Sequence, residues 1–376
     1  MQPNSLHEQV HTALSRAINE GGPAIEVVAD AGTPEGARVE YLQPQQLPGF
    51  TDPLLVVRTS GSTGRAKRTV LSTSAMAASS QATAEFLGLQ GQWLLALPVH
   101  YIAGLSVLTR SLFAGTTPVA METNGGFSAQ KFTEAAEQLT EANKLTSLVP
   151  TQLARLLDNP APRTVAALKS LDAILLGGAR ASRDLLTAAR HLGLKIFQTY
   201  GSSETAGGLV YNGTALPGVS LREENGRILV SGPMLADGYL ADPQATARHF
   251  VLREGRRWYL TDDLGSIENN KLQIHGRIDD VINTGGIKLS AGRVEGLLDE
   301  FFDQCLVVPV PDGQWGQAVG LAFSGPSDTA PAFEAVRRTF GAPAVPKRVR
   351  HYPQGLPLLP NGKVNRRLVI EQLSAM

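Results

Sequence analysis

The chain has 376 residues, of which 43% are hydrophobic, and its 34 lysines and arginines balance 34 aspartates and glutamates. This length predicts two or three domains with sizeable cores, which excludes a mini-protein or a disordered chain. Zero net charge gives no general attraction to nucleic acid or anionic lipid, so we expect no nucleic-acid partner. The single cysteine, Cys305, can form neither an intramolecular disulfide nor a cysteine-rich zinc site. A reducing, cytoplasmic setting is therefore the default expectation.

The amino terminus predicts a soluble helix and not a targeting segment. Residues 1–18 lack the basic stretch, continuous apolar core and cleavage site of a secretory signal. Their apolar residues recur at helical spacing, and Asn4 or Ser5 could cap the helix. The longest apolar stretch, around residues 94–108, contains a proline, a histidine and a glycine. We therefore expect no membrane insertion.

The middle of the chain predicts an α/β fold with mixed sheets. Apolar runs at residues 54–57, 171–176 and 194–197 lead into glycine-rich turns or helical patterns, and residues 183–191 have helical spacing. This order indicates a parallel or mixed sheet with crossover helices. Ligand-binding loops are then expected at the carboxyl ends of the strands.

The pattern of apolar and polar residues changes after about Gly213. Short alternating runs separated by frequent turns predict an antiparallel β region attached to the α/β part. After Gly276, helix-like and strand-like patches are followed by a segment rich in proline and glycine. We predict a large domain over residues 1–276 and a small α+β domain over residues 277–376.

The strongest local signal is a glycine-rich loop directly after the first apolar run. It reads Thr59, Ser60, Gly61, Ser62, Thr63, Gly64, Arg65, Ala66, Lys67. Glycines let backbone N–H groups approach an anion, hydroxyls add donors, and a lysine adds a charge, so the loop predicts a phosphate-binding site. The P-loop of ATPases has a different spacing. A flexible turn is the alternative interpretation.

This loop resembles the phosphate loop of the adenylate-forming superfamily, which includes acyl-CoA synthetases, adenylation domains and luciferases. Further motifs resembling that superfamily follow in the expected order. They contain Gly178 and Ala179; Tyr200, Gly201, Ser203 and Glu204; Asp262 and Asp263; Arg277 and Asp279; Gly285 and Gly286; and Lys363. Ser203 and Asp262 depart from the threonine and the glycine that the superfamily usually has.

The resemblance implies an enzyme that activates a carboxylic acid with ATP and transfers the acyl group to coenzyme A. Glu204, Lys67 and Lys363 would be catalytic, and Glu204 would also hold Mg²⁺. The implied nucleotide contacts are Thr59, Ser60, Gly61, Ser62, Thr63, Gly64 and Lys67 on the phosphates, Gly178, Ala179, Tyr200 and Gly201 around adenine, Ser203 on the α-phosphate, Asp263 on the ribose, and Arg277 on the ribose or phosphates.

The same resemblance implies a hinge. Asp279 would be the pivot of a mobile carboxyl-terminal domain, and Gly285 and Gly286 would line the entry path of the thiol. Taken singly, these motifs have structural alternatives. Glu204 could be a helix-start carboxylate, the two aspartates at 262 and 263 a turn, and Lys363 a solvated surface lysine.

Two segments resemble the o-succinylbenzoate–CoA ligases of menaquinone biosynthesis. These are residues 97–106 with the following Arg110, and residues 147–157. The group implies an aromatic dicarboxylic acid as substrate. Another aryl- or acyl-CoA ligase is the nearest alternative, and a catalytically silent nucleotide-binding module is a more distant one.

Four side chains in or beside these segments are candidates for binding the acid. Arg110 could pair with a second carboxylate, and Ser147 or Thr151 could donate hydrogen bonds to it. His100 could gate the pocket or contact the acid. The alternatives are that Arg110 is a surface helix residue and His100 a hydrogen-bonded structural histidine.

The resemblance covers roughly residue 50 to the end. The phosphate loop begins closer to the amino terminus than is usual for the superfamily, so we expect an amino-terminal domain that is shortened at its start. A homodimer is expected only from the habit of the family.

Overall fold

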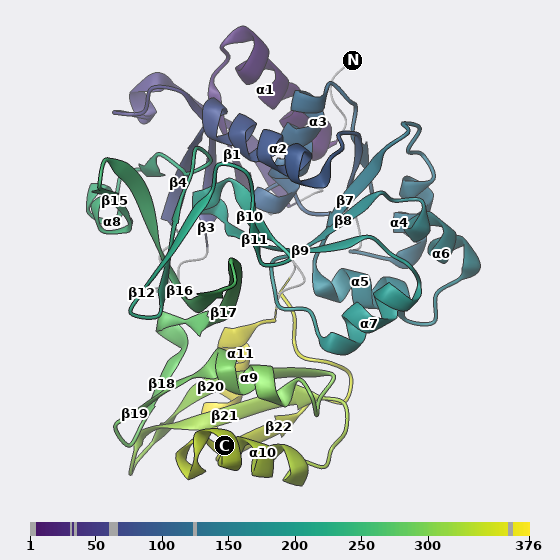
Figure 1. The fold of residues 1–376 in the computed structure, drawn as a ribbon. Helices are drawn as coiled ribbons and strands as arrows, with labels where there is room; N and C mark the ends of the chain where they lie inside the picture. Colours follow the sequence, from purple (N-terminus) through teal and green to yellow (C-terminus); the bar gives the residue numbers. More distant parts are fainter. Residues whose placement is uncertain (1–4, 31, 34–35, 60–66, 123–125, 360–363) are drawn as a thin grey trace. The chain divides into compact units, whose positions relative to one another are not determined.

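The computed structural model describes residues 5–30, 32–33, 36–59, 67–122, 126–359 and 364–376 (Figure 1). The chain divides into two compact units. The first comprises Met1–Ala179, Ala188–Arg222 and Leu229–Leu260, and the second comprises Arg180–Thr187, Glu223–Ile228 and Thr261–Met376. The domain boundary between residues 276 and 277 stays a prediction.

The first unit contains a five-stranded mixed sheet in the order β14-β4-β3-β1-β2. Its strands are β1 (Ala24–Ala29), β2 (Ala37–Leu42), β3 (Pro53–Thr59), β4 (Lys67–Ser72) and β14 (Gly238–Tyr239). β1 and β3 are parallel, and the other pairings are antiparallel. The strand predicted at residues 54–57 is confirmed as part of β3. The element after its loop is β4, in which Thr69, Val70 and Leu71 form a buried run that suits a strand.

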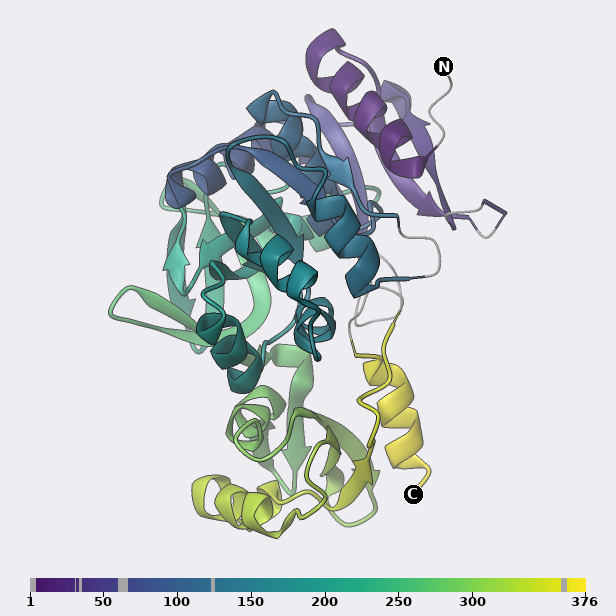
Figure 2. The same ribbon diagram turned by 90° about the vertical axis from the view of Figure 1, so that its right-hand side faces the viewer.

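The predicted amino-terminal helix is α1 (Leu6–Glu20), which lies along β1 and β2 (Figure 2). Its N-cap is Ser5, whose backbone N–H donates to the Glu8 carboxylate at 3.2 Å. Val10 and Leu14 are fully buried, as the helical spacing predicts. A short 3₁₀ helix, η1 (Pro44–Gln46), lies between β2 and β3.

A seven-stranded sheet in the order β11-β10-β9-β8-β7-β5-β6 completes the α/β part of the first unit. The strands are β5 (Gln92–Leu95), β6 (Val119–Ala120), β7 (Lys144–Leu148), β8 (Ala173–Leu176), β9 (Ile196–Ser202), β10 (Gly207–Tyr211) and β11 (Thr214–Ala215). Pairing is parallel from β6 to β9 and antiparallel beyond β9. The predicted parallel arrangement is confirmed.

Helices connect these strands. They are α2 (Thr73–Leu87), α3 (Ile102–Ala114), α4 (Ala129–Ala136), α5 (Pro150–Leu157), α6 (Pro162–Lys169) and α7 (Arg183–His191), and η2 (Ser203–Thr205) follows β9. The bounds of α7 equal the predicted ones. Among helices in the described ranges, none combines the length and the apolar composition that a bilayer crossing requires.

The predicted antiparallel region is confirmed as a sheet in the order β12-β13-β16-β15, with β17 also pairing with β16. Its strands are β12 (Ser220–Glu224), β13 (Arg227–Ser231), β15 (Phe250–Arg253), β16 (Arg256–Glu268) and β17 (Lys271–Arg277), and α8 (Pro243–His249) precedes β15. The division between the two units falls within β16, after Leu260.

The rest of the second unit is built on a sheet in the order β19-β18-β21-β20, with β22 beside β21. The strands are β18 (Val281–Thr284), β19 (Ile287–Ser290), β20 (Gln304–Asp312), β21 (Gly316–Ser324) and β22 (Arg348–His351). The helices are α9 (Ala291–Leu298), α10 (Ala330–Phe340) and α11 (Arg366–Ser374), with η3 (Ile278–Asp280) and η4 (Ala342–Ala344).

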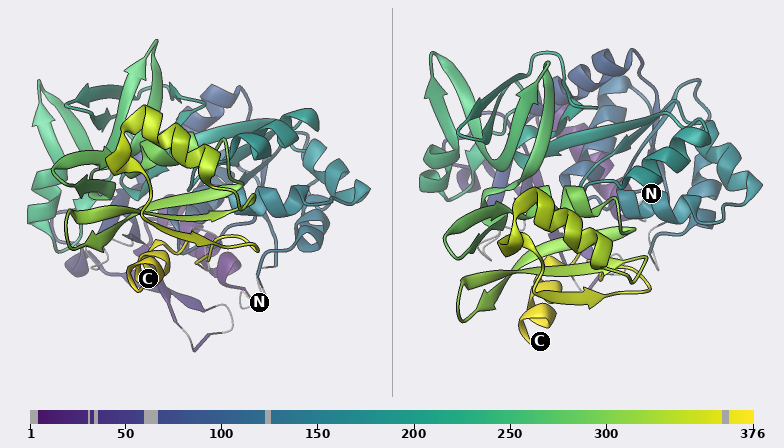
Figure 3. Two further views of the ribbon diagram at one scale, coloured as in Figure 1. Left: turned by 90° about the horizontal axis from the view of Figure 1, so that it is seen from below. Right: turned by 60° about the horizontal axis from the view of Figure 1, so that its bottom comes forward.

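Alternate residues of β20 and β21 enter two separate cores of this unit. Val307 and Leu321 pack with α9 and α10 on one face, whereas Val308 and Ala322 pack with α11 on the other. Figure 3 shows α10 and α11 on opposite sides of the sheet.

Candidate active site

The predicted phosphate loop connects two antiparallel strands. Thr59 ends β3, Lys67 begins β4, and the two residues are paired across the hairpin. The Thr59 hydroxyl donates to the Lys67 carbonyl oxygen at 3.4 Å. The predicted contacts Ser60, Gly61, Ser62, Thr63 and Gly64 lie outside the described residues.

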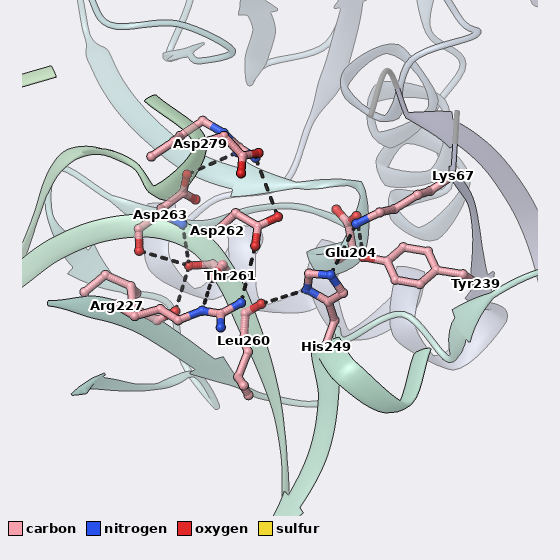
Figure 4. A network of polar contacts seen from close by, with 12 residues as sticks. Lys67, Glu204, Arg227, Tyr239, His249, Leu260, Thr261, Asp262, Asp263 and Asp279 are labelled. Atoms are coloured by element: carbon pink, nitrogen blue, oxygen red, sulfur yellow. Dashed lines mark hydrogen bonds and ion pairs between the residues drawn. The ribbon is translucent and has the colours of Figure 1, made fainter. Parts of the chain in front are cut away.

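Lys67 contacts a tyrosine and a histidine of the same unit (Figure 4). Its Nζ lies 4.9 Å from the centroid of the Tyr239 ring and 3.3 Å from Nε2 of His249. Both partners are uncharged in this arrangement, because only an unprotonated ring nitrogen can accept a hydrogen bond from an ammonium group. Lys67 therefore keeps its positive charge available for an anion.

Glu204 is buried in η2 beside Ser203, and 7% of its surface is exposed. Its Oε1 accepts a hydrogen bond from the Tyr239 hydroxyl at 3.0 Å. Across the described residues, no group of three or more His, Cys, Asp and Glu side chains could form a metal centre. A single carboxylate nevertheless fits Mg²⁺, which commonly takes one or two protein carboxylates and completes its shell with phosphates and water.

Glycines of the two predicted adenine motifs permit close backbone packing. A Cβ on Gly177 would lie 2.3 Å from the Thr199 hydroxyl, and a Cβ on Gly201 would lie 2.0 Å from the Gly207 carbonyl oxygen. The next glycine, Gly178, has φ 82°, which favours glycine. Its neighbour Ala179 follows β8, while Tyr200 is half-buried in β9. Contact of these residues with a nucleotide stays a prediction.

Arg110 is buried in α3, with 6% of its surface exposed, so the surface interpretation is wrong. Its Nη2 donates to the Tyr211 hydroxyl at 3.3 Å, and its guanidinium carbon lies 5.1 Å from the Trp93 ring centroid. Its Nε finds no hydrogen-bond partner within the described ranges. The arginine lines a cavity of about 350 Å³ between α2 and α3. An incompletely paired buried guanidinium can bind a carboxylate.

The other three acid-binding candidates lie on neighbouring elements of the first unit. Ser147 is buried near the end of β7, and Thr151 lies in the first turn of α5. His100 lies just before α3, with its ring centroid 4.2 Å from that of Tyr101, and burial lowers the pKa of its imidazole. Contact of these side chains with the acid stays a prediction.

Asp263 and Arg277 come together within the second unit, across the pairing of β16 with β17. Arg277 Nη1 lies 3.3 Å from Asp263 Oδ1, and Nη2 lies 3.7 Å from Asp262 and 3.9 Å from Asp279. Asp262 also accepts a hydrogen bond from Arg227 at 3.3 Å (Figure 4). Burial lowers the pKa of the Arg277 guanidinium, but the surrounding carboxylates outweigh this effect and raise the pKa overall.

The two glycines of the predicted thiol path form the turn between β18 and β19. Gly285 and Gly286 have φ 59° and 85°, as a two-residue type I′ hairpin turn requires. A Cβ on Gly285 would also lie 2.4 Å from the Trp315 ring. The predicted pivot, Asp279, lies in η3, and the predicted catalytic lysine, Lys363, lies outside the described residues.

Sequence reasoning missed two residues of the Lys67 group, Tyr239 and His249. Their places become visible only in the structure, where Tyr239 is buried and a Cβ on Gly238 would lie 2.6 Å from Thr246. Nothing in the sequence distinguishes His249, which is 182 residues from Lys67 along the chain.

Comparisons with known proteins agree with the motifs. A profile of the AMP-binding enzyme family matches residues 5–240, so the similarity begins well before residue 50. The probable 2-succinylbenzoate–CoA ligase of Mycobacterium tuberculosis strain H37Rv is 39% identical over 338 residues, which cover 86% of this chain and 85% of that protein.

Two solved structures have a similar fold at 26% identity. The o-succinylbenzoate CoA synthetase MenE of Bacillus subtilis, in complex with the acyl-adenylate intermediate OSB-AMP, has a TM-score of 0.70 and covers 88% of this chain and 71% of that chain. ATP-bound MatB of Rhodopseudomonas palustris has a TM-score of 0.72 and covers 86% of this chain and 68% of that chain. The chain therefore belongs to the AMP-binding family of adenylate-forming enzymes and has 2-succinylbenzoate–CoA ligases among its relatives.

Proposed function

We propose that the chain is an AMP-forming 2-succinylbenzoate–CoA ligase that uses ATP, Mg²⁺ and coenzyme A. A carboxylate is a poor electrophile and must first gain a leaving group. One of its oxygens attacks the α-phosphorus of ATP, which expels pyrophosphate and forms an acyl-AMP. The coenzyme A sulfur then attacks the acyl carbonyl, and AMP leaves.

The observation that carries this proposal is the similarity to the Mycobacterium tuberculosis ligase, which extends over most of both chains. The buried Arg110 supports an acid with a second carboxylate, because a guanidinium that lines a cavity without an anionic partner among the described residues is costly. We assign His100, Ser147 and Thr151 to the same acid.

The first half-reaction brings a carboxylate to a polyphosphate, so charge placement is the main catalytic device. A pair of unit charges about 4 Å apart interacts by roughly 4 kcal/mol at an effective dielectric of about 20. We assign Lys67, the loop from Thr59 to Gly64, and Lys363 to this task. Mg²⁺ held by Glu204 would further neutralise the phosphate oxygens.

The remaining nucleotide contacts follow the motifs. Gly178, Ala179, Tyr200 and Gly201 are assigned to adenine and Ser203 to the α-phosphate. Asp263 is assigned to the ribose hydroxyls, since a carboxylate can accept hydrogen bonds from both, and Arg277 to the ribose or phosphates.

The second half-reaction requires a different arrangement around the acyl-AMP. We propose that residues 277–376 form a mobile domain that turns about Asp279, while residues 1–276 form the AMP-binding domain. The turn at Gly285 and Gly286 would then admit the slim pantetheine arm of coenzyme A. A homodimer remains part of this proposal.

A panel of acids assayed for AMP and thioester tests the proposed function. We expect 2-succinylbenzoate to give both products with the highest kcat/KM. A wide preference for benzoate, malonate or a fatty acid would identify another acyl-CoA ligase, and ADP in place of AMP would contradict the adenylate chemistry.

A further inference from the structure

We propose that Tyr239 and His249 are positioning residues that hold Lys67 and Glu204 in place before the nucleotide binds. The inference rests on the proposed function, in which Lys67 contacts phosphate oxygens and Glu204 holds Mg²⁺. All four residues belong to the first unit, and Figure 4 shows their side chains near one another.

The hydrogen bonds of His249 determine which nitrogen carries its proton. Nδ1 lies 3.1 Å from the Leu260 carbonyl oxygen, which can only accept, so Nδ1 is the protonated nitrogen. Nε2 therefore has a free lone pair, and it faces the Lys67 ammonium at 3.3 Å. The imidazole is therefore a neutral acceptor. The hydrogen bond at Nδ1 fixes both its tautomer and the orientation of the ring.

Tyr239 serves two partners with two parts of its side chain. The ring face lies under the Lys67 ammonium, and the hydroxyl donates to Glu204 Oε1 at 3.0 Å. Only 2% of the surface of Tyr239 is exposed, so the ring has little freedom to move. One rigid side chain thus sets the positions of a cation and a carboxylate that the proposed chemistry must use together.

Local structure explains why Tyr239 occupies this place. β14 pairs with β4, and Tyr239 is directly opposite Thr69. Lys67 lies two residues before Thr69, so their side chains share one face of the sheet. The backbone N–H of Tyr239 donates to the Thr246 hydroxyl of α8 at 2.9 Å, which ties β14 to the helix that ends at His249.

Neutral partners are the feature that distinguishes this arrangement from an ordinary ion pair. A carboxylate beside Lys67 would hold it as firmly but would cancel much of its attraction for phosphate. An imidazole and a phenol ring restrict a side chain that otherwise has large rotamer entropy, and they leave its charge intact. Restriction before binding lowers the entropic cost of binding.

Binding of ATP to a series of His249 variants, measured by calorimetry without any acid, tests the inference. His249→Gln keeps a neutral acceptor, His249→Glu replaces it with an anionic one, and His249→Phe keeps the ring without an acceptor. We expect near wild-type affinity for Gln, and losses of about tenfold for Phe and at least as much for Glu. The losses should persist in EDTA.

Tyr239→Phe tests the hydrogen bond to Glu204 separately from the contact of the ring with Lys67. It retains the ring face under Lys67 and removes only the hydroxyl that holds Glu204. Affinity for ATP in EDTA should stay within about twofold of the wild type, whereas the tightening that Mg²⁺ causes should be reduced by about tenfold.

His191→Gln on the exposed side of α7 is the matched control, and melting temperatures establish that each variant is folded. Equal ATP affinity in the wild type and His249→Phe would overturn the positioning role, and equal affinity in the Gln and Glu variants would overturn the neutral-partner argument. A wild type that binds ATP but activates none of the acids would instead refute the proposed function.

Discussion

Lys67 and Arg277 lie among side chains of opposite kinds. Lys67 in the first unit is held by an imidazole and a phenol ring, both neutral. Arg277 in the second unit faces three carboxylates at 3.3 to 3.9 Å. Nearby anions cancel the field of a cation, so the charge of Arg277 is compensated by its partners, whereas the two contacts of Lys67 leave its charge intact.

The Lys67 group and the Arg277 group also differ in how deeply their side chains are buried. Tyr239 and Glu204 are buried, whereas 45% of the Arg277 side chain is exposed. Water and salt screen exposed ion pairs, so the Arg277 pairs contribute little to stability and can exchange partners easily. The first group is therefore suited to fixed geometry and the second to rearrangement.

The largest expected effect comes from removing the cation that an imidazole and a phenol ring hold. Lys67→Met should lower the rate of ATP–pyrophosphate exchange by about 10²- to 10³-fold, because a preorganised charge on the phosphates is lost. The control is Lys195→Met, since Lys195 already pairs with Asp172 at 2.8 Å on the surface. Equal rates in the two variants would remove the distinction between a cation held by neutral groups and a cation held in an ion pair.

A second prediction concerns Arg110, whose Nε has no hydrogen-bond partner among the described residues. Arg110→Met should raise KM for 2-succinylbenzoate by about tenfold to a hundredfold and leave KM for ATP unchanged. The effect should vanish for an analogue without the second carboxylate. Tyr211→Phe, which removes only the hydroxyl bonded to Arg110, is the matched control. A parallel rise in both KM values would refute the assignment.

A smaller effect on KM for ATP is expected at the two aspartates beside Arg277, and it should differ between them. Asp263→Asn should raise KM for ATP by about tenfold, because a charged acceptor for the ribose is lost. Asp262→Asn should change it by less than about threefold, since Asp262 engages Arg277 and Arg227 in partly exposed pairs. Steady-state kinetics with varied ATP would measure both, and a reversed order would contradict the ribose assignment.

The smallest effect concerns a partly buried carboxylate of the second unit, Glu295. Burial raises its pKa, despite a hydrogen bond from the Val307 N–H and the nearby Arg366. A raised folded-state pKa means that the folded protein binds more protons than the unfolded one between the two pKa values, so stability falls as pH rises through that window.

Glu295→Gln should abolish that fall, because the amide oxygen can still accept from Val307 and Arg366 keeps its pair with Asp280 at 3.2 Å. We expect a gain in melting temperature on the order of a few degrees at pH 8 and a smaller one near pH 5. A gain that grows toward acid pH would show that the sign is wrong.

The elements that the sequence predicts best are those defined by periodicity. Apolar runs followed by glycine-rich turns located β8, β9 and the helix between them, because strand and helix spacing are local properties. The sequence made no prediction for β4, where the strand is set by pairing with β3 and β14 and not by its own short pattern.

The site shows the same limit. Contiguous motifs made Lys67, Glu204 and Asp263 candidates, and their roles stay predictions, because a motif in a loop or at a strand end lies within a few neighbouring residues. Tyr239 and His249 reach Lys67 only through strand pairing and the packing of α8, contacts that no local pattern records. The burial of Arg110 likewise depends on α2, Trp93 and Tyr211, so sequence alone left it open.

The central claim is that a carboxylate oxygen of 2-succinylbenzoate attacks the α-phosphorus of ATP. Its most direct test uses the acid labelled with ¹⁸O in both carboxylates, together with ATP, Mg²⁺ and coenzyme A, and mass spectrometry of the products. We predict one ¹⁸O atom in each AMP and none in pyrophosphate. Label in inorganic phosphate with release of ADP, or AMP free of label, would contradict the account.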